Sequence, residues 1–328
     1  MHGYFTLSSQ TFNCIKTMGE NPTKVRRLTV PDLDRILGQP WKVLDDGFIR
    51  VVDYIGADAA IVQAARISYG AGTKTVHEDV GLIRYLMRHQ HTTPFEMCEI
   101  KLHIRVPMDT WRQWIRHRTA NVNEYSTRYS IAIDGTTITP PDKWRKQSSS
   151  AKQGSGEMLP EATGKALTDR EAELQGLSRK VYEERITAGV AREQARKDLP
   201  LCTFTEAYWK IDLHNLFHFL LLRMHEHAQE EIRAYANIIG HEIVSRWCPI
   251  AWQAFKDYHL NSLSLSMIEI RVVQQLSQGD IEGALTTAKK GGWLERDSRG
   301  LKPNRERREA EIKLKTLGIK VPWVNSSI

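Results

Sequence analysis

Alternating apolar and polar residues predict several strands in the first two thirds of the chain. The predicted strands are 41–44, 48–52, 99–106 and 203–211. The first two are separated by Asp46-Gly47, a turn signal typical of hairpins, so we expect them to pair with each other. Pro107 follows the third strand at a position where helices commonly begin.

Apolar residues that recur every three or four positions predict helices. The predicted helices are 59–67, 77–90, 108–118, 162–187, 213–223 and 228–247, followed by short amphipathic helices from about residue 262. The helix 162–187 is long and strongly charged, and we expect Leu167, Leu174, Leu177 and Val181 to form its apolar seam. The helix 213–223 is very apolar, which predicts a buried position.

These elements indicate an α+β fold, in which a central, mostly antiparallel sheet is surrounded by helices. We expect an N-terminal extension at 1–40, a main domain at 41–260 and a basic helical C-terminal extension at 261–328. The stretch 146–156 is rich in Ser, Gly, Lys and Gln and is interpreted as a mobile loop or a disordered insert.

The net charge of +7 is concentrated near the C-terminus. Between Lys289 and Lys320 the chain carries eleven Lys or Arg against five Asp or Glu, an excess of six that leaves the remainder close to neutral. A nucleic-acid-binding protein that uses this tail is one alternative function. We do not expect nucleic acid as the primary partner, because the tail alternates Glu with Lys and Arg as exposed helices do.

Cysteine usage and hydropathy favour a cytoplasmic protein without a membrane segment. The four cysteines (Cys14, Cys98, Cys202 and Cys248) are widely spaced and form no CxxC pair, which is typical of free thiols in a reducing compartment. No apolar run approaches the roughly 18 residues of a membrane span, and the N-terminus lacks the pattern of a secretory signal.

An arginine cluster is the most informative local feature. Arg112, Arg116, Arg118 and Arg128 lie close together in sequence, with only Glu124 nearby to offset them. On a helix Arg112 and Arg116 share a face, where like charges cost about 0.2–0.5 kcal/mol. A bound anion would explain the cluster, since the planar guanidinium grips phosphate with two parallel hydrogen bonds.

The residues between these arginines favour a nucleotide pocket over the alternative, a solvated basic face. They include Trp111, Trp114, His117, Asn123 and Ser126, a mixture of aromatic bodies and short polar groups.

Four segments of the chain resemble the flavin-dependent thymidylate synthases. Arg116-His117-Arg118, seven intervening residues and Ser126 are similar to that family's RHRx7S signature. The segments 91–96 (HTTPFE), 65–68 (ARIS) and 212–232 are similar to three more of its motifs, in family order. A chance match to a short pattern would not extend over residues 42–258.

The resemblance implies reductive methylation of dUMP to dTMP, with methylenetetrahydrofolate as one-carbon donor, FAD as cofactor and NADPH as reductant. It implies a homotetramer whose active sites form between subunits. The residues implied for dUMP are Gln113, Trp114, Ile115, Arg116, Glu124, Tyr125, Ser126, Thr127, Arg128, Arg196 and Arg223. Those implied for FAD are Ser68, Thr93, Arg116, His117, Arg118, Thr119, Glu124, Asp212, Leu213, His214 and His218.

Arg223 and His91 are the implied catalytic residues. Uracil C5 is a poor nucleophile, and by resemblance Arg223 activates it by stabilising charge at N3 and O4. The alternative is a structural ion pair of Arg223 with Glu226 or Glu230. By the same resemblance, His91 lies on the flavin side and also guides folate. The alternative is a core histidine that caps the preceding helix.

Other chemistries fit the residues less well. Cys202 follows Pro200-Leu201 in a predicted strand and lacks the Pro-Cys context of the classical thymidylate synthases, so covalent cysteine catalysis is disfavoured. There is no GxGxxG, so side chains such as Arg118 must neutralise the flavin diphosphate. His214 and His218 have a spacing that can bind zinc, but no Cys, Asp or HExxH glutamate completes the set.

Two positions depart from the pattern of some family members. Asp212 and His214 stand where some relatives have Asn and Arg, which affects the flavin contacts implied for them. The third candidate function is a flavin enzyme with different chemistry, such as a reductase acting on another nucleotide.

Overall fold

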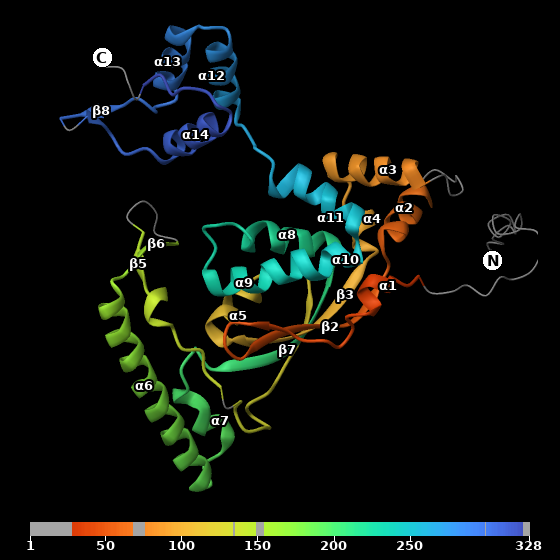
Figure 1. Cartoon of the computed structure of the whole chain (residues 1–328), viewed down its shortest axis with the longest axis vertical. Coiled ribbons are helices and arrows are strands. Elements are labelled where there is room, and N and C mark those ends of the chain that lie inside the picture. The colour runs from red at the N-terminus through yellow and green to blue at the C-terminus, as the bar shows by residue number, and fades with distance from the viewer. Residues whose placement is uncertain (1–27, 68–75, 134, 149–153, 299, 324–328) are drawn as a thin grey trace, which may run out of the picture. The chain divides into compact units, whose positions relative to one another are not determined.

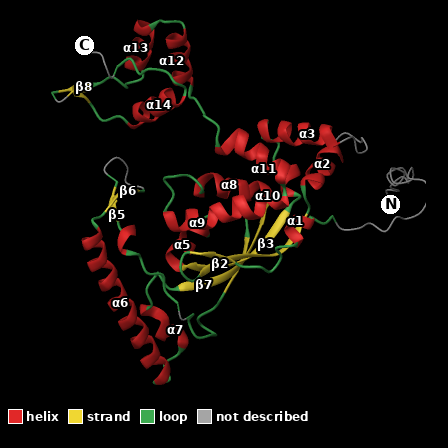
Figure 2. Cartoon of the chain, viewed as in Figure 1, coloured by secondary structure: helices red, strands yellow, loops and turns green. Residues whose placement is uncertain are grey.

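The computed structural model describes residues 28–67, 76–133, 135–148, 154–298 and 300–323. The chain divides into two compact units, Met1–Phe255 and Lys256–Ile328. The α+β fold expected from the sequence is confirmed in the first unit, where a sheet packs against helices (Figures 1 and 2).

An antiparallel sheet of five strands, in the order β1-β2-β3-β7-β4, organises the described part of this unit. Its strands are β1 (Trp41–Val43), β2 (Gly47–Ile55), β3 (Glu99–Pro107), β4 (Asn121–Glu124) and β7 (Phe204–Asp212). The predicted hairpin at Asp46-Gly47 is confirmed, since Val43 pairs with Gly47. β3 pairs with β7 from Glu99↔Asp212 to Pro107↔Phe204 without a register shift.

The two faces of the sheet differ because the strands alternate. Ile100, Leu102, Ile104 and Val106 of β3 are at most 1% exposed and face the helical side. Helices on this side of the sheet include α5 (Met108–Trp114), α8 (Leu213–Arg223) and α9 (Glu230–Ile238) (Figure 1). A buried aromatic cluster joins them to the sheet, with Trp209 of β7 at 5.2 Å from the ring of Phe219.

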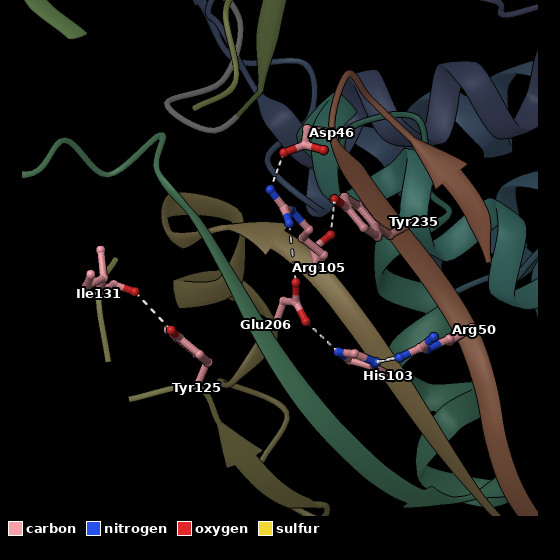
Figure 3. A network of polar contacts seen from close by, with 8 residues as sticks. All are labelled: Asp46, Arg50, His103, Arg105, Tyr125, Ile131, Glu206 and Tyr235. Atoms are coloured by element: carbon pink, nitrogen blue, oxygen red, sulfur yellow. Dashed lines mark hydrogen bonds and ion pairs between the residues drawn. The ribbon is translucent and has the colours of Figure 1, made fainter. Parts of the chain in front are cut away.

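The opposite face of the same strands carries a polar network (Figure 3). Arg50 donates to Nδ1 of His103, whose Nε2 lies 2.8 Å from the Glu206 carboxylate. Glu206 also pairs with Arg105 at 3.4 Å, and Arg105 reaches Asp46. These contacts connect β2, β3 and β7 and match every arginine of the network with an acceptor.

Further helices surround the sheet. They are α1 (Pro31–Asp34), α2 (Asp58–Ile67), α3 (Val76–Arg88), α4 (Thr93–Glu96), α6 (Glu161–Thr187), α7 (Arg192–Ala195), α10 (Ser245–Trp247) and α11 (Pro249–Phe255), with 3-10 turns at Pro141–Lys143 and Arg196–Asp198. The predicted helix 228–247 is interrupted, because a π-helical segment, Ile239–Val244, separates α9 from α10. Within the predicted loop 146–156, β5 (Arg145–Gln147) pairs with β6 (Ser155–Met158), and residues 149–153 lie outside the described residues.

The predicted seam of α6 is wrong about which face is buried. Leu174 and Leu177 are 64% and 61% exposed, whereas Gly164, Gln175 and Tyr182 are buried. A side chain at Gly164 would collide with the Pro141 carbonyl, so this glycine permits a close approach to the preceding turn. Polar contacts of Gln175 and a small hydrophobic cluster around Tyr182 hold α6 to its own unit, while Leu174 and Leu177 face outward.

The C-terminal unit has a hydrophobic core of its own. The core includes Trp293 and Trp323, packed at 5.9 Å against each other. The unit contains a π-helical segment (Lys256–Leu260), α12 (Met267–Ser277), α13 (Ile281–Lys290), a hairpin of β8 (Arg296–Asp297) and β9 (Gly300–Leu301), and α14 (Arg305–Thr316). Several basic residues of the tail are paired, for example Lys313 with Glu269 at 2.9 Å. No helix in the described ranges has the length and hydropathy needed to cross a membrane.

Candidate active site

The arginine cluster begins on α5 and continues beyond its end. The predicted helix 108–118 stops at Trp114, and the N–H of Arg116 bonds to Gln113 O at 3.3 Å in a tightened last turn. The chain turns here because β4 must pair with β7, a tertiary requirement that overrides the helical pattern. Arg112 and Arg116 therefore do not share a helical face, contrary to the prediction.

The tryptophans of this segment belong to the core. The Trp114 ring is 0% exposed and lies 4.9 Å from Phe219, 5.2 Å from Trp209 and 5.6 Å from Tyr235. Trp111 is also buried. Their inclusion in a nucleotide pocket was wrong, and only the main chain of Trp114 remains for contact with dUMP. The indoles instead fix the helix that carries the arginines.

Three arginines of the cluster have no counter-charge in the described part of the chain. Arg112, Arg116 and Arg118 are exposed, and none of them makes an ion pair or hydrogen bond through its side chain with the residues described. Elsewhere arginines are commonly matched, as Arg145 is with Glu230 and Glu231 at 2.8 Å each. Unmatched guanidinium groups on one short segment are suited to a phosphate or diphosphate ligand.

His117 and Arg223 meet although they are far apart in sequence. Arg223 Nε donates to His117 Nε2 at 3.0 Å. The same imidazole packs edge-on against Phe219 at 4.9 Å and against His218 at 5.9 Å. Because Nε2 is the acceptor, the proton of the neutral imidazole is assigned to Nδ1.

Burial and positive charge favour a neutral His117 beside a charged Arg223 near neutral pH. Desolvation, together with the positive charge of Arg223 and the neighbouring His218, lowers the pKa of His117 to about 4. Burial also lowers the pKa of Arg223 from its usual value, although a guanidinium remains charged near neutrality. The alternative ion pairs are wrong, since Glu230 binds Arg145 and Arg223 has no carboxylate partner among the described residues.

Helix α8 places several of the implied flavin residues. Asp212 is its N-cap and accepts from the Asn215 N–H at 2.9 Å. Leu213 is 0% exposed, so its side chain is a core group and only its main chain can face a ligand. His214 and His218 are one turn apart on the side of α8 that is not buried, and His218 lies next to His117.

A second group of implied substrate residues gathers around α7 and the segment after β4. Arg196 donates to the Thr127 hydroxyl at 2.6 Å, and Arg128 pairs with Glu193 at 3.3 Å. The Ser126 hydroxyl accepts from the main-chain N–H of Arg128 at 3.4 Å.

The chain leading into this second group is fixed to the sheet. Thr205 donates to Glu124 at 2.9 Å, and the Tyr125 hydroxyl donates to the Ile131 carbonyl at 2.9 Å (Figure 3). Glu193, which the motif comparison did not include, is recognisable only through its contact with Arg128.

His91 and Thr93, both implied on the flavin side, lie in the turn after α3 and at the start of α4. His91 is exposed rather than in the core, and its main-chain N–H bonds to Leu86 O at 2.9 Å in the turn that ends α3. Gln90 adopts the left-handed conformation that this helix end requires, with φ of 57°. Thr93 begins α4 and is exposed, and Ser68 lies outside the described residues.

Two features bear on the alternative chemistries. Burial and nearby Glu171 raise the pKa of the Cys202 thiol to about 11, so it stays protonated near neutral pH and is a poor nucleophile. In the described ranges no three His, Cys, Asp or Glu side chains are arranged to hold a metal ion.

Gln113, one of the residues implied for dUMP, donates a hydrogen bond to Gln229, a residue that the sequence comparison did not single out.

Comparison with known proteins assigns this arrangement to a family. Residues 50–250 match the family model described as thymidylate synthase complementing protein. A flavin-dependent thymidylate synthase of Wolbachia pipientis wMel is 53% identical over 256 residues, covering 78% of this chain and 89% of the relative. The chain belongs to the flavin-dependent thymidylate synthases. A relative with that name from Ehrlichia ruminantium (strain Gardel) is 49% identical and covers 85% of this chain and 94% of its own length.

A solved structure supports the same membership. The UMP/dUMP methylase PolB from Streptomyces cacaoi, bound with 5-Br dUMP, is 27% identical with a TM-score of 0.60. The match covers 67% of this chain and 99% of PolB. As a member of the family, the chain is an FAD-dependent methyltransferase of dTMP synthesis, which confirms the function implied by the motifs. The roles of individual residues and the oligomeric state stay predictions.

Proposed function

We propose that this chain methylates C5 of dUMP reductively, with Arg223 as the group that activates the uracil ring. The one-carbon unit comes from methylenetetrahydrofolate, and NADPH supplies the reducing equivalents. The observation that carries the proposal is the Arg223 guanidinium, half-buried and held by neutral His117 without a carboxylate partner among the described residues.

The physical role of Arg223 follows from its surroundings. Leu216, Phe217, Phe219 and Leu220 on the same helix are buried, so one side of the guanidinium lies against a medium of low dielectric constant. A positive charge there stabilises negative charge that develops at N3 and O4 of uracil more strongly than it would in water. A carboxylate partner would cancel much of this effect.

The residues implied for FAD suit a flavin nucleotide. Arg116 and Arg118 offer unmatched positive charge to the diphosphate, and Thr119 is exposed beside them. His117, His214 and His218 offer imidazoles on one side of α8. FAD, when bound and reduced, supplies the hydride of the reaction.

The substrate would be held by two groups of residues. Arg196, Thr127 and Ser126 present hydrogen-bonding atoms suited to phosphate, and Gln113 and Arg223 lie near the flavin residues on the helical side. Helix α7 and helix α8 lie on different sides of the sheet (Figure 1). We therefore infer that one site combines α7 of one chain with α8 of another, as a homotetramer with sites between subunits requires. We place this activity in the cytoplasm.

A direct assay tests the proposed function. Purified protein should carry flavin absorbance and form dTMP only when dUMP, methylenetetrahydrofolate and NADPH are all present. UMP serves as the matched substrate control, because PolB is named for both nucleotides while the more similar relatives are named thymidylate synthases. Protein that stays colourless after incubation with FAD, or that turns over without dUMP, contradicts the proposal.

A further inference from the structure

Helix α6 has one side that packs against its own unit and another side that exposes leucines. One side contacts its own unit through Gly164, Gln175 and Tyr182, which are buried. Another side carries Leu174 and Leu177, which are 64% and 61% exposed. Single exposed leucines are common on protein surfaces, so their spacing decides whether these two are significant.

The residues along this side follow a heptad spacing of alternating three and four residues. The positions are Leu167, Arg170, Leu174, Leu177, Val181 and Glu184, named here the outer seam. Three leucines and a valine at such positions form a narrow stripe of the kind that pairs two helices. Leu167 is 38% exposed, and Val181 is half-buried.

We propose that the outer seam is a docking surface for the outer seam of a second copy of this chain, with the two α6 helices antiparallel. In the register centred between Leu174 and Leu177, each Leu174 packs against Leu177 of the second copy. Leu167 then lies opposite Glu184 of the copy, and Arg170 opposite Val181. The stripe is therefore complementary to itself, as a two-fold contact requires.

The two charged positions of the seam select this orientation. Arg170 and Glu184 of the second copy are three residues, about 4.5 Å, apart along the helix axes in this register. Glu184 is exposed and makes no ion pair within the described residues, and Arg170 has only an exposed contact with Glu173 at 2.6 Å. A parallel pair in register would place Arg170 against Arg170 and Glu184 against Glu184, which is unfavourable.

This inference deepens the proposed assembly and rests on it, because it names one contact between the subunits. The seam spans fewer than three heptads, so it contributes to a larger interface rather than holding two chains together alone. Charge and leucine spacing together favour a second copy over an unrelated partner.

Cysteine cross-linking tests the register. Leu174→Cys and Leu177→Cys would be produced separately and also co-expressed with different affinity tags, then oxidised mildly. We expect a disulfide between chains in the co-expressed pair and little in either variant alone, since like positions would be separated by more than about 7 Å. Wild-type protein and Ala172→Cys, on the exposed side of α6 away from the seam, measure the background from native cysteines.

The possible outcomes distinguish failure of the outer-seam contact from failure of the proposed tetramer. Strong self-linking of Leu174→Cys alone would overturn the antiparallel register. Leu174→Glu/Leu177→Glu should lower the assembled mass in light scattering or shift its dissociation to at least tenfold higher protein concentration, while Ala172→Glu should not. If this double variant assembles as wild type does and no cross-link forms, the seam is not a contact, although the proposed tetramer stands. If wild-type protein is itself monomeric, the proposed assembly fails as well.

Discussion

His103 and His117 both accept a hydrogen bond from an arginine, and they differ in what else they touch. His103 accepts from Arg50 and reaches the Glu206 carboxylate at 2.8 Å. His117 accepts from Arg223 but lies beside a second histidine and a phenylalanine. The first network therefore balances its charges, whereas no carboxylate among the described residues compensates the guanidinium of the second.

The difference separates a structural network from a site. Balanced charges on the sheet face hold three strands together and leave nothing for a ligand to neutralise. At His117 and Arg223 the described residues supply no negative charge, which suits the pair to a bound anion or to charge that develops in a reaction. Variants of the two networks should consequently fail in different assays.

Replacement of Arg223 should have the largest effect on catalysis. We expect Arg223→Gln to lower the rate of dTMP formation at saturating dUMP by about 10²–10³, the loss seen when a group that stabilises developing charge is removed. Flavin content and circular dichroism should remain those of wild type. A turnover within a factor of about three of wild type would show that another group activates uracil.

Acidification should affect the same pair next. Since the pKa of His117 is lowered to about 4, the folded protein binds fewer protons here than the unfolded chain as pH falls from 6.5. This contribution to stability is complete above pH 6.5 and is lost towards pH 4, where imidazolium would also repel Arg223. We expect the acid limb of the kcat profile to lie below pH 5 and to disappear in His117→Gln, measured with buffer-matched controls.

The acceptor atom of His117 is the next target. His117→Gln retains an oxygen acceptor near the position of Nε2, whereas His117→Phe retains the ring but not the acceptor. We expect the Phe variant to lose about fivefold to tenfold in kcat, the equivalent of one hydrogen bond, and the Gln variant to lose less. Equal losses in both variants, with flavin retained, would assign the effect to ring packing.

Breaking the balanced network should change stability instead of chemistry. Glu206→Gln removes a carboxylate that pairs with Arg105 and contacts His103, both partly buried, and should cost about 1–3 kcal/mol in urea unfolding at fixed protein concentration. Activity per folded molecule should stay unchanged. A large fall in kcat without loss of stability would mean that the sheet face takes part in the reaction.

The smallest expected effect concerns the helix that carries Arg223. Asp212→Ala removes the N-cap of α8 and should lower the free energy of unfolding by about 1 kcal/mol. Asp212→Asn is the matched control, because asparagine also caps helices. If both variants lose flavin equally while stability is retained, Asp212 contacts the cofactor directly rather than through the helix.

Much of the fold followed from local pattern, and the exceptions have tertiary causes. The strands β3 and β7 alternate strictly because one face packs against helices, so their sequences report their burial. The early end of α5 depends on the pairing of β4 with β7, which no local pattern carries. The leucines of α6 predicted a buried seam, but the helix is fixed through another face, by the polar contacts of Gln175, the close approach at Gly164 and the hydrophobic cluster around Tyr182.

The sequence predicted which residue types belong to the candidate site, but not how those residues contact one another. The motifs identified the arginines and histidines, and family membership confirms the chemistry they imply. The contact between His117 and Arg223 joins positions 106 residues apart, so its existence could not be predicted from spacing. Trp114 was misplaced because an aromatic residue in a polar segment suits a pocket and a core equally well.

Imidazole nitrogen NMR of His117 tests the central claim most directly. We expect the wild-type ring to stay neutral down to about pH 5, with Nδ1 protonated and Nε2 the acceptor, and its pKa to rise when Arg223 is replaced by Gln. An ordinary pKa near 6.5 in wild-type protein, unchanged in the variant, would contradict a His117 held neutral against an uncompensated guanidinium.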